Sequence, residues 1–181
     1  MNVEHLALEG VLLLHARVFP DARGLVYESW RDGAYRELGM PPFVQDTVSR
    51  SARHVLRGLH FQRRHPQGKL LTVLAGEILD VVADVRPVSP TFGQHVAVVL
   101  RGGSGDQLWV PAGYAHGFVV RSAEADVHYK LTDVYHADDQ GGVRWDDPTL
   151  AVPWGVEAPL LSDKDAALPW LADLGPEALP A

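Results

Sequence analysis

The residues best suited to chemistry lie close together within residues 55–71, VLRGLHFQRRHPQGKLL. Arg57 and His60 stand in an apolar run that is typical of a strand, and Lys69 begins the next apolar run. Imidazole titrates at about pH 6.5, so His60 can accept a proton at neutral pH. The sequence therefore predicts a base with two cations on or beside one pair of strands.

A structural role is the alternative for each of these residues. A histidine on a strand is often a packed residue, and Arg57 and Lys69 would ordinarily be solvated surface cations. That interpretation does not explain why two cations flank a histidine in an apolar strand. Desolvated cations are costly unless an anion meets them, and a phosphate or an enolate would satisfy both. We therefore predict acid–base chemistry on an anionic substrate.

Composition and charge restrict the class of protein. The 181 residues are 46% hydrophobic and 22% charged, which is typical of one globular domain spanning residues 1–181. The formal net charge of −7 argues against nucleic-acid binding, so an anionic ligand must be held by a few placed cations. Cysteine is absent, which excludes disulfides, thiolate metal sites and a cysteine nucleophile.

The N-terminal region gives no indication of a membrane segment. Glu4 and Glu9 precede a short apolar run at residues 11–14, without the basic start of a signal peptide. That run is far shorter than the roughly 20 residues that span a bilayer. We expect a cytoplasmic protein that does not interact with membranes.

Short β-strands separated by turn residues dominate the pattern. One short helix is predicted over residues 30–38, and the proline-containing tail from about residue 166 is predicted to be loop-like. Regularly spaced strands favour a sandwich or barrel. Strands are predicted at residues 11–18, 25–29, 43–48, 55–61, 69–74, 78–85, 94–100, 107–110, 118–120 and 126–132.

A metal site of the cupin type is one alternative, because the chain has nine histidines. PAGYAH, residues 111–116, fits the second half of the cupin metal motif. The first half is missing, since His60 is followed two residues later by Gln62, and His65 lies at the wrong spacing to share an ion. Lys69 would also repel a divalent cation. We therefore expect no bound metal and no other cofactor.

A set of motifs taken together resembles the dTDP-4-dehydrorhamnose 3,5-epimerase family. The similarity extends in register from about residue 11 to residue 165, and the motifs are specific only in combination. They are SRS (49–51), LRGLHFQ (56–62), PQGKL (66–70), SPTFG (89–93), QLWVP (107–111), AHGF (115–118), YK (129–130) and LLSDKD (160–165).

The resemblance implies an all-β fold, a cupin-type double-stranded β-helix or jelly roll with a few short helices. It also implies a cofactor-free homodimer that exchanges N-terminal strands. The implied reaction is epimerisation of a nucleotide-linked 4-keto-6-deoxyhexose, from dTDP-4-dehydro-6-deoxy-D-glucose to dTDP-4-dehydro-L-rhamnose. A ketone at C4 acidifies the C–H bonds at C3 and C5, so such an enzyme needs a base, an enolate stabiliser and an acid.

The resemblance also implies roles for individual residues. His60 would be the base, and Asp165 would hydrogen-bond the far imidazole nitrogen and orient the ring. Lys69 would stabilise the enolate, and Tyr129 would return a proton from the opposite face. The matching substrate-binding positions are Arg23, Glu28, Gln45, Arg57, His116, Tyr135 and Lys164, of which the first two would reach the neighbouring subunit's site.

Four positions depart from the family pattern: Thr47, Phe61, Val134 and Gln140. None belongs to the proposed acid–base set, but they alter the pocket wall, which bears on the number of centres that are inverted. Four alternatives therefore stay open: an epimerase that inverts only C3 or only C5, a ketoisomerase, a metal-dependent cupin oxygenase or isomerase, and a non-catalytic sugar-nucleotide binding protein.

Overall fold

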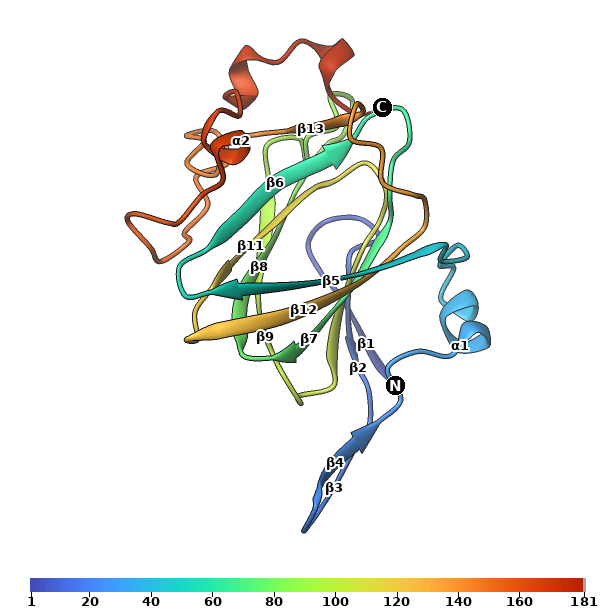
Figure 1. The fold of residues 1–181 in the computed structure, drawn as a ribbon. Helices are drawn as coiled ribbons and strands as arrows, with labels where there is room; N and C mark the ends of the chain where they lie inside the picture. The colour runs from blue at the N-terminus through green and yellow to red at the C-terminus, as the bar shows by residue number, and fades with distance from the viewer. Residues whose placement is uncertain (181) are drawn as a thin grey trace.

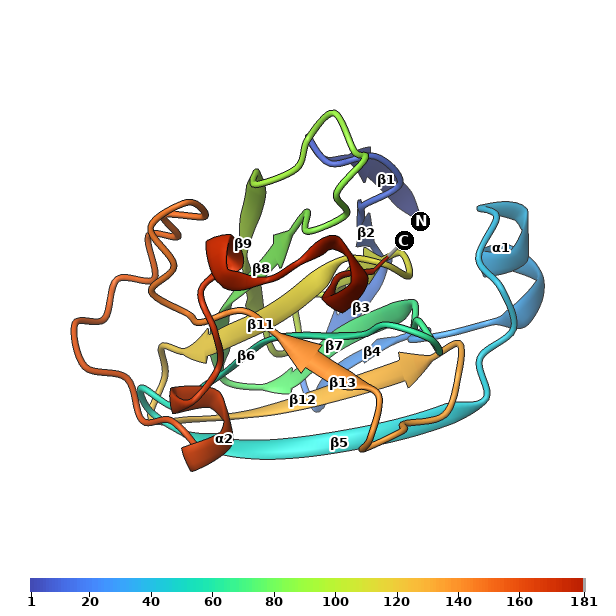
Figure 2. The ribbon, with the colours of Figure 1, turned by 90° about the horizontal axis from the view of Figure 1, so that it is seen from above.

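Two antiparallel sheets pack face to face in the computed structural model, which describes residues 1–180 (Figures 1 and 2). The architecture confirms the predicted all-β jelly roll. In spatial order, the first sheet contains β1 (Asn2–His5), β2 (Leu12–His15), β10 (Asp106–Val110), β7 (Lys69–Ala75), β12 (Glu124–Leu131) and β5 (Gln45–Ala52). The second contains β13 (Gln140–Gly142), β6 (Leu56–Gln62), β11 (Ala115–Val120), β8 (Glu77–Ala83) and β9 (His95–Arg101).

One expectation about the strands was wrong. The residues around His60 and Lys69 were predicted to lie on one strand pair, but β6 belongs to the second sheet and β7 to the first. The connection, residues 63–68, contains Pro66 and carries the chain from one sheet to the other. His60 and Lys69 therefore project from different sheets, which allows them to line a space between the sheets from two sides.

Three apolar clusters hold the structure together, and the third packs Tyr35 against Leu70 and Trp109 of the first sheet. The first lies between the sheets and includes Leu71, Val82 and Phe118. The second lies on the other face of the second sheet, where the C-terminal segment covers it (Figure 2). Because both faces are covered, every residue of β11 is buried and an alternating polar pattern is absent there.

The C-terminal segment is more ordered than the predicted loop. It contains α2 (Asp163–Ala166) and two short 3₁₀ helices, η1 (Leu171–Asp173) and η2 (Pro176–Ala178). Leu171 and Leu179 are buried in the second cluster. The many prolines led to the prediction of a loop, because local propensity does not register burial. Burial of these side chains is what fixes the segment.

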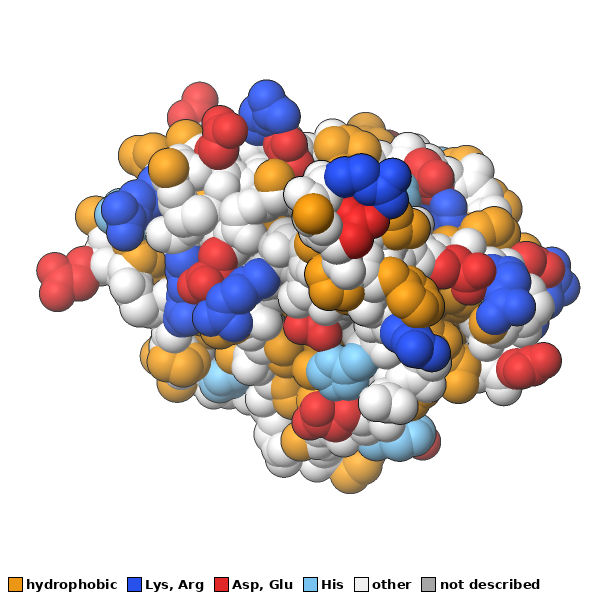
Figure 3. Space-filling view, turned by 90° about the horizontal axis from the view of Figure 1, so that it is seen from below, with side chains coloured by type: hydrophobic (Ala, Val, Ile, Leu, Met, Phe, Trp, Pro, Cys, Tyr) orange, Lys and Arg blue, Asp and Glu red, His pale blue; other side chains and the backbone are white. Residues whose placement is uncertain are grey.

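The chain between β2 and β5 forms a hairpin and a helix that packs on the first sheet. The predicted helix is found as α1 (Asp32–Glu37), preceded by the hairpin of β3 (Val18–Asp21) and β4 (Gly24–Tyr27), which projects from the body (Figure 1). Seen from the side toward which the hairpin points, hydrophobic side chains are exposed among charges of both signs (Figure 3). The exposed apolar residues of the hairpin are Phe19, Leu25 and Val26.

No helix within residues 1–180 is long and apolar enough to cross a membrane.

Candidate active site

A cavity of about 480 Å³ lies between the two sheets and collects all four predicted catalytic residues. His60 projects from β6 of the second sheet, and Asp165 reaches the cavity from α2, which packs beside β6 (Figure 1). Lys69 and Tyr129 project from β7 and β12 of the first sheet. The candidate base and the candidate acid therefore lie on opposite walls.

His60 and Asp165 form a hydrogen-bonded pair although they are 105 residues apart in the chain. His60 Nε2 lies 2.5 Å from Asp165 Oδ1, and the carboxylate is almost fully buried. Burial raises the pKa of Asp165, whereas the hydrogen bond and the charge of His60 lower it. The lowering is larger in total, so the pKa lies below its ordinary value. A carboxylate on Nε2 requires the proton to be on that nitrogen, which leaves Nδ1 free to act as a base.

The short helix α2 places Asp165. Ser162 is its N-cap, and the Ser162 hydroxyl accepts a hydrogen bond from the Asp165 backbone N–H at 3.1 Å. This serine cap at the start of SDKD explains why the segment turns at this point despite its short length.

A β-bulge brings Arg57 and His60 to the same cavity. Residues three apart on a regular strand face opposite sides. Here His116 pairs with His60 and Phe118 pairs with Arg57, so β6 contains one residue more than β11 over this interval. The extra residue restores Arg57 to the cavity side, a use of bulges that is common beside active sites.

Gly58 makes the bulge possible. Its φ is +124°, and a Cβ at this position would lie 2.5 Å from Gly117 Cα. We expect Gly58→Ala to destabilise the fold by about 1–3 kcal/mol, because the backbones of β6 and β11 must separate. Gly33→Ala is the matched control, since no atom lies within 4 Å of a Cβ there. Chemical denaturation measures both, and equal stability of the two variants would contradict this account of the bulge.

Lys69 presents a cation of unusually low basicity. Burial lowers the pKa of the Lys69 ammonium to about 8, although the nearby Asp80 carboxylate raises it. The ammonium lies 3.3 Å from the backbone carbonyl oxygen of His60 and donates to it. A charge held this way can interact strongly with an anion that forms within hydrogen-bonding distance.

Tyr129 retains its proton well above neutral pH. Burial raises the pKa of its hydroxyl above the ordinary value, and Asp80 adds to the effect. The Tyr129 ring meets the His116 ring edge-on, with 6.4 Å between the ring centroids. A neutral phenol in this position can donate a proton to a carbanion.

A second buried histidine–carboxylate pair was missed by the sequence analysis. His116 Nε2 lies 2.8 Å from Asp80 Oδ1, and both side chains are buried. Burial lowers the pKa of His116 and Asp80 raises it. The effect of burial is larger, so the pKa lies below its ordinary value and the neutral ring is favoured at pH 7. Asp80 Oδ2 has no hydrogen-bond partner within residues 1–180. The sequence indication of this pair is that an aspartate interrupts the apolar residues 78–83 of β8.

Most of the predicted binding residues reach the cavity. Gln45, Arg57, His116, Tyr135 and Lys164 line it. Arg23 and Glu28 do not: they lie on or beside the β3–β4 hairpin and form ion pairs with Asp21 and Arg31. Arg57, Lys69 and Lys164 outnumber Asp165 among the charged lining residues, so the cavity is cationic in a protein of net charge −7.

Three of the four departures from the family pattern also line the cavity, namely Thr47, Phe61 and Gln140, whereas Val134 does not. Within residues 1–180, no three His, Cys, Asp or Glu side chains gather to hold a metal ion.

Comparison with known proteins identifies the family. Residues 5–173 match the family model described as dTDP-4-dehydrorhamnose 3,5-epimerase. The chain is 48% identical to the dTDP-4-dehydrorhamnose 3,5-epimerase of Pseudomonas aeruginosa, over 91% of this chain and 93% of the relative. It is 46% identical to the Escherichia coli enzyme of the same name, over 96% of each chain.

Solved structures agree with this similarity. A dTDP-6-deoxy-D-glucose-3,5-epimerase from Legionella pneumophila, in complex with dTDP-4-keto-L-rhamnose, superposes with a TM-score of 0.95 at 46% identity, covering 99% of this chain and 97% of that chain. A 3'-monoepimerase from Streptomyces bikiniensis, in complex with dTDP-quinovose, gives a TM-score of 0.91 at 31% identity, covering 97% and 91%. The chain therefore belongs to the dTDP-4-dehydrorhamnose 3,5-epimerase family.

Proposed function

We propose that the protein epimerises dTDP-4-dehydro-6-deoxy-D-glucose at C3 and C5 to give dTDP-4-dehydro-L-rhamnose. The observation that carries the proposal is the position of His60 and Tyr129, which line one cavity from opposite sheets. Inversion of a carbon centre requires removal of a proton from one face and its return to the other. The names of the relatives from Pseudomonas aeruginosa and Escherichia coli support the same activity.

The mechanism follows from the arrangement of the four catalytic candidates. The C4 ketone makes the neighbouring C–H bonds acidic, and His60 Nδ1 removes a proton while Asp165 stabilises the imidazolium that forms. The Lys69 ammonium stabilises the enolate oxygen at C4. Tyr129 then donates a proton to the opposite face of the same carbon. His60 then releases its proton to solvent and Tyr129 regains one from solvent, so that the same steps at the second carbon complete the conversion.

Substrate binding in the proposal uses the cations around the cavity. Arg57 and Lys164 suit the diphosphate, since a guanidinium offers paired donors and an ammonium offers a point charge. Gln45, Tyr135 and the neutral His116 provide polar contacts to the nucleotide and the sugar.

The proposal includes a homodimer in which each β3–β4 hairpin reaches its neighbour. The hairpin forms a separate two-stranded sheet and exposes three apolar side chains, Phe19, Leu25 and Val26, which a second copy would cover. Arg23 and Glu28 would then meet the nucleotide in the neighbouring cavity. A cytoplasmic location remains a prediction from the sequence.

The proposed chemistry uses only side chains of the protein and needs no metal or organic cofactor. We expect the rate of conversion of dTDP-4-dehydro-6-deoxy-D-glucose, followed by proton NMR, to be unchanged after the enzyme has been treated with a chelator and desalted. Loss of activity on chelation, with recovery on adding a divalent metal, would favour a metal-dependent cupin instead. Binding of the substrate without conversion would favour a non-catalytic binding protein.

Replacement of Tyr129 by phenylalanine separates the two proton transfers. In deuterated water, Tyr129→Phe should still exchange substrate protons through His60, whereas formation of the inverted product should fall by about 10²-fold or more. The ring and its packing are kept, so stability should change little. Equal loss of exchange and inversion would contradict the assignment of Tyr129 as the acid.

A mono-epimerase is the second candidate. Two observations favour it: the superposition with a 3'-monoepimerase, and the altered residues Thr47 and Phe61 in the cavity wall. Both candidates would use the same base and acid, so they differ in the number of carbon positions that exchange protons.

A further inference from the structure

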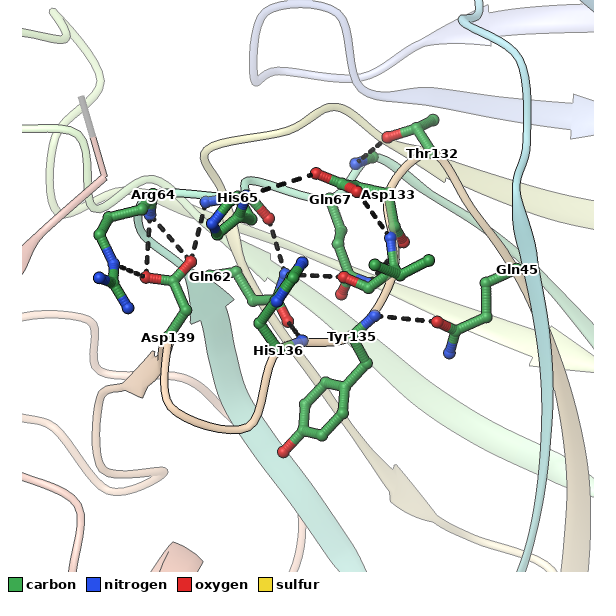
Figure 4. Close-up of polar contacts among 12 residues, drawn as sticks. Gln45, Gln62, Arg64, His65, Gln67, Thr132, Asp133, Tyr135, His136 and Asp139 are labelled. Atoms are coloured by element: carbon green, nitrogen blue, oxygen red, sulfur yellow. Dashed lines mark hydrogen bonds and ion pairs between the residues drawn. The ribbon is translucent and has the colours of Figure 1, made fainter.

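The loop between β12 and β13, residues 132–139, carries Tyr135 to the cavity and is named here the mouth loop. The turn between β6 and β7, residues 63–68, lies beside it (Figure 4). Tyr135 has an exposed fraction of 49%, so its ring is not held by burial. Its hydroxyl donates a hydrogen bond to Gln140 Oε1 at 2.6 Å, which orients the tip of the ring. The backbone of Tyr135 is placed by the attachment of the loop that carries it.

Gln62 connects the two segments. It is the last residue of β6, two positions after His60, and only 4% of it is exposed. Its side-chain Nε2 donates to the His65 carbonyl oxygen at 2.7 Å and to the Val134 carbonyl oxygen at 3.3 Å. Its Oε1 accepts from the His136 backbone N–H at 2.7 Å (Figure 4). Both amide protons and the amide oxygen are thus used on backbone groups.

The hydrogen bonds of Gln62 hold the residues on both sides of Tyr135. Val134 and His136 are its immediate neighbours, and both bond to the same amide group. The Tyr135 backbone N–H donates to Gln45 Oε1 at 2.9 Å, which attaches the loop to the first sheet as well. The mouth loop is therefore tied to β6 of one sheet and β5 of the other.

Further contacts between the mouth loop and the turn lie away from Tyr135. Gln67 Nε2 donates to the Asp133 carbonyl oxygen at 2.8 Å, at the start of the loop. Asp139, at its end, accepts from the Arg64 and His65 backbone N–H groups. These contacts hold the two ends of the loop, and Gln62 holds its centre.

We propose that Gln62 is a positioning residue, whose buried amide holds the mouth loop in place so that Tyr135 is fixed over the cavity before substrate arrives. An ordered loop binds ligand without the cost of ordering it on binding. The inference rests on the proposed function for the identity of the ligand. The ordering of the loop does not depend on that function.

Hydrogen exchange in the free protein tests the ordering directly. Gln62→Met keeps the length of the side chain and removes all three hydrogen bonds. The informative amide is that of Tyr135, because its own acceptor, Gln45, is unchanged. We expect this amide to exchange about 10-fold faster or more in the variant, since several hydrogen bonds hold the segment closed in the native protein. An unchanged rate at Tyr135 would overturn the proposal.

Gln107→Met provides a matched control. Gln107 is also a buried glutamine, and its side-chain amide bonds the Ser29 carbonyl oxygen, the Thr72 hydroxyl and the Tyr35 hydroxyl, but it does not line the cavity. Its loss should reduce the overall stability without a selective increase in exchange at Tyr135. If the two variants accelerate Tyr135 exchange to the same extent at equal stability, Gln62 has no special role.

A double-mutant cycle on dTDP binding tests the route through Tyr135. We expect Gln62→Met to weaken dTDP binding, measured by calorimetry, by about 10-fold, and to raise KM far more than it changes kcat. In a Tyr135→Ala background the same change should cost less than about 2-fold. Additive losses would mean that Gln62 contacts the ligand directly, and would overturn the proposal.

Gln62→Glu keeps the shape of the side chain if the methionine variant does not fold. The introduced carboxylate would face the carbonyl oxygens of His65 and Val134. Compared with wild type at the same pH, exchange at Tyr135 should therefore be faster at neutral pH and closer to the wild-type rate where the carboxyl is protonated. Absence of any acceleration would count against the proposal. A wild-type protein that fails to bind dTDP would contradict the proposed function alone, because the exchange results stand without ligand.

Discussion

Replacement of His60 by alanine is expected to reduce kcat for epimerisation by about 10²- to 10⁴-fold, the range that a positioned general base contributes. The reason is the geometry of the His60–Asp165 pair. Nε2 lies 2.5 Å from the carboxylate, so Nδ1 is the nitrogen that can accept the substrate proton. A water molecule in the space left by the ring would be a much weaker base. Turnover of the purified variant, followed by proton NMR, measures the effect. A kcat within about 3-fold of wild type would contradict the assignment of the base.

Asp165→Asn distinguishes loss of the base from loss of its orientation. An amide at this position cannot stabilise the imidazolium, and it can hold the ring in the wrong tautomer. If His60 and Asp165 act as a unit, the double variant should be no slower than His60→Ala alone. Thermal unfolding of each variant serves as the control, because Asp165 is buried and each substitution alters its hydrogen bond with His60. Multiplicative losses would indicate separate roles.

Replacement of Lys69 by methionine is expected to lower kcat by about 10²- to 10³-fold, which is typical for loss of one preorganised electrostatic stabiliser. Methionine keeps most of the length and the apolar part of the side chain, so the packing around β7 should survive. Binding of dTDP should change less than kcat, since the enolate charge exists only during the reaction. A loss confined to KM would place Lys69 among the binding residues instead.

The pH profile gives an independent check on Lys69. The pKa of its ammonium lies at about 8, and only the protonated form stabilises an enolate. As the pH rises through that value the charge is lost, so kcat/KM should fall on the alkaline side of about pH 8. Lys69→Met should lack this alkaline limb, whereas Lys69→Arg should move it to higher pH. A wild-type profile that stays flat to pH 10 would contradict the role of the ammonium.

The residues that line the cavity were more predictable from the sequence than the way in which the fold brings them together. Motif resemblance brought together His60, Lys69, Tyr129 and Asp165, all of which line the cavity. Strand periodicity alone could not do so, because β6 and β7 follow each other in the chain but belong to different sheets. The bulge that turns Arg57 toward the cavity also has no periodic signal, apart from the glycine that permits it.

Buried polar residues explain much of what was missed. Asp80 and Gln62 sit in otherwise apolar strands, where a sequence pattern does not reveal their partners, since His116 and the mouth loop come from distant parts of the chain. The C-terminal segment was predicted to be loop-like because it is rich in proline, yet Leu171 and Leu179 pack against the second sheet. In each case tertiary contacts, rather than local propensity, decide the structure.

The most direct test of the proposed function is the number of carbon positions that exchange protons with solvent. Wild-type protein would be incubated with dTDP-4-dehydro-6-deoxy-D-glucose in deuterated water, and the sugar examined by proton NMR. Inversion at both centres predicts deuterium at C3 and at C5, with no incorporation in the His60→Ala variant. Deuterium at only one position would show a mono-epimerase, and absence of deuterium at both would contradict proton exchange beside the ketone altogether.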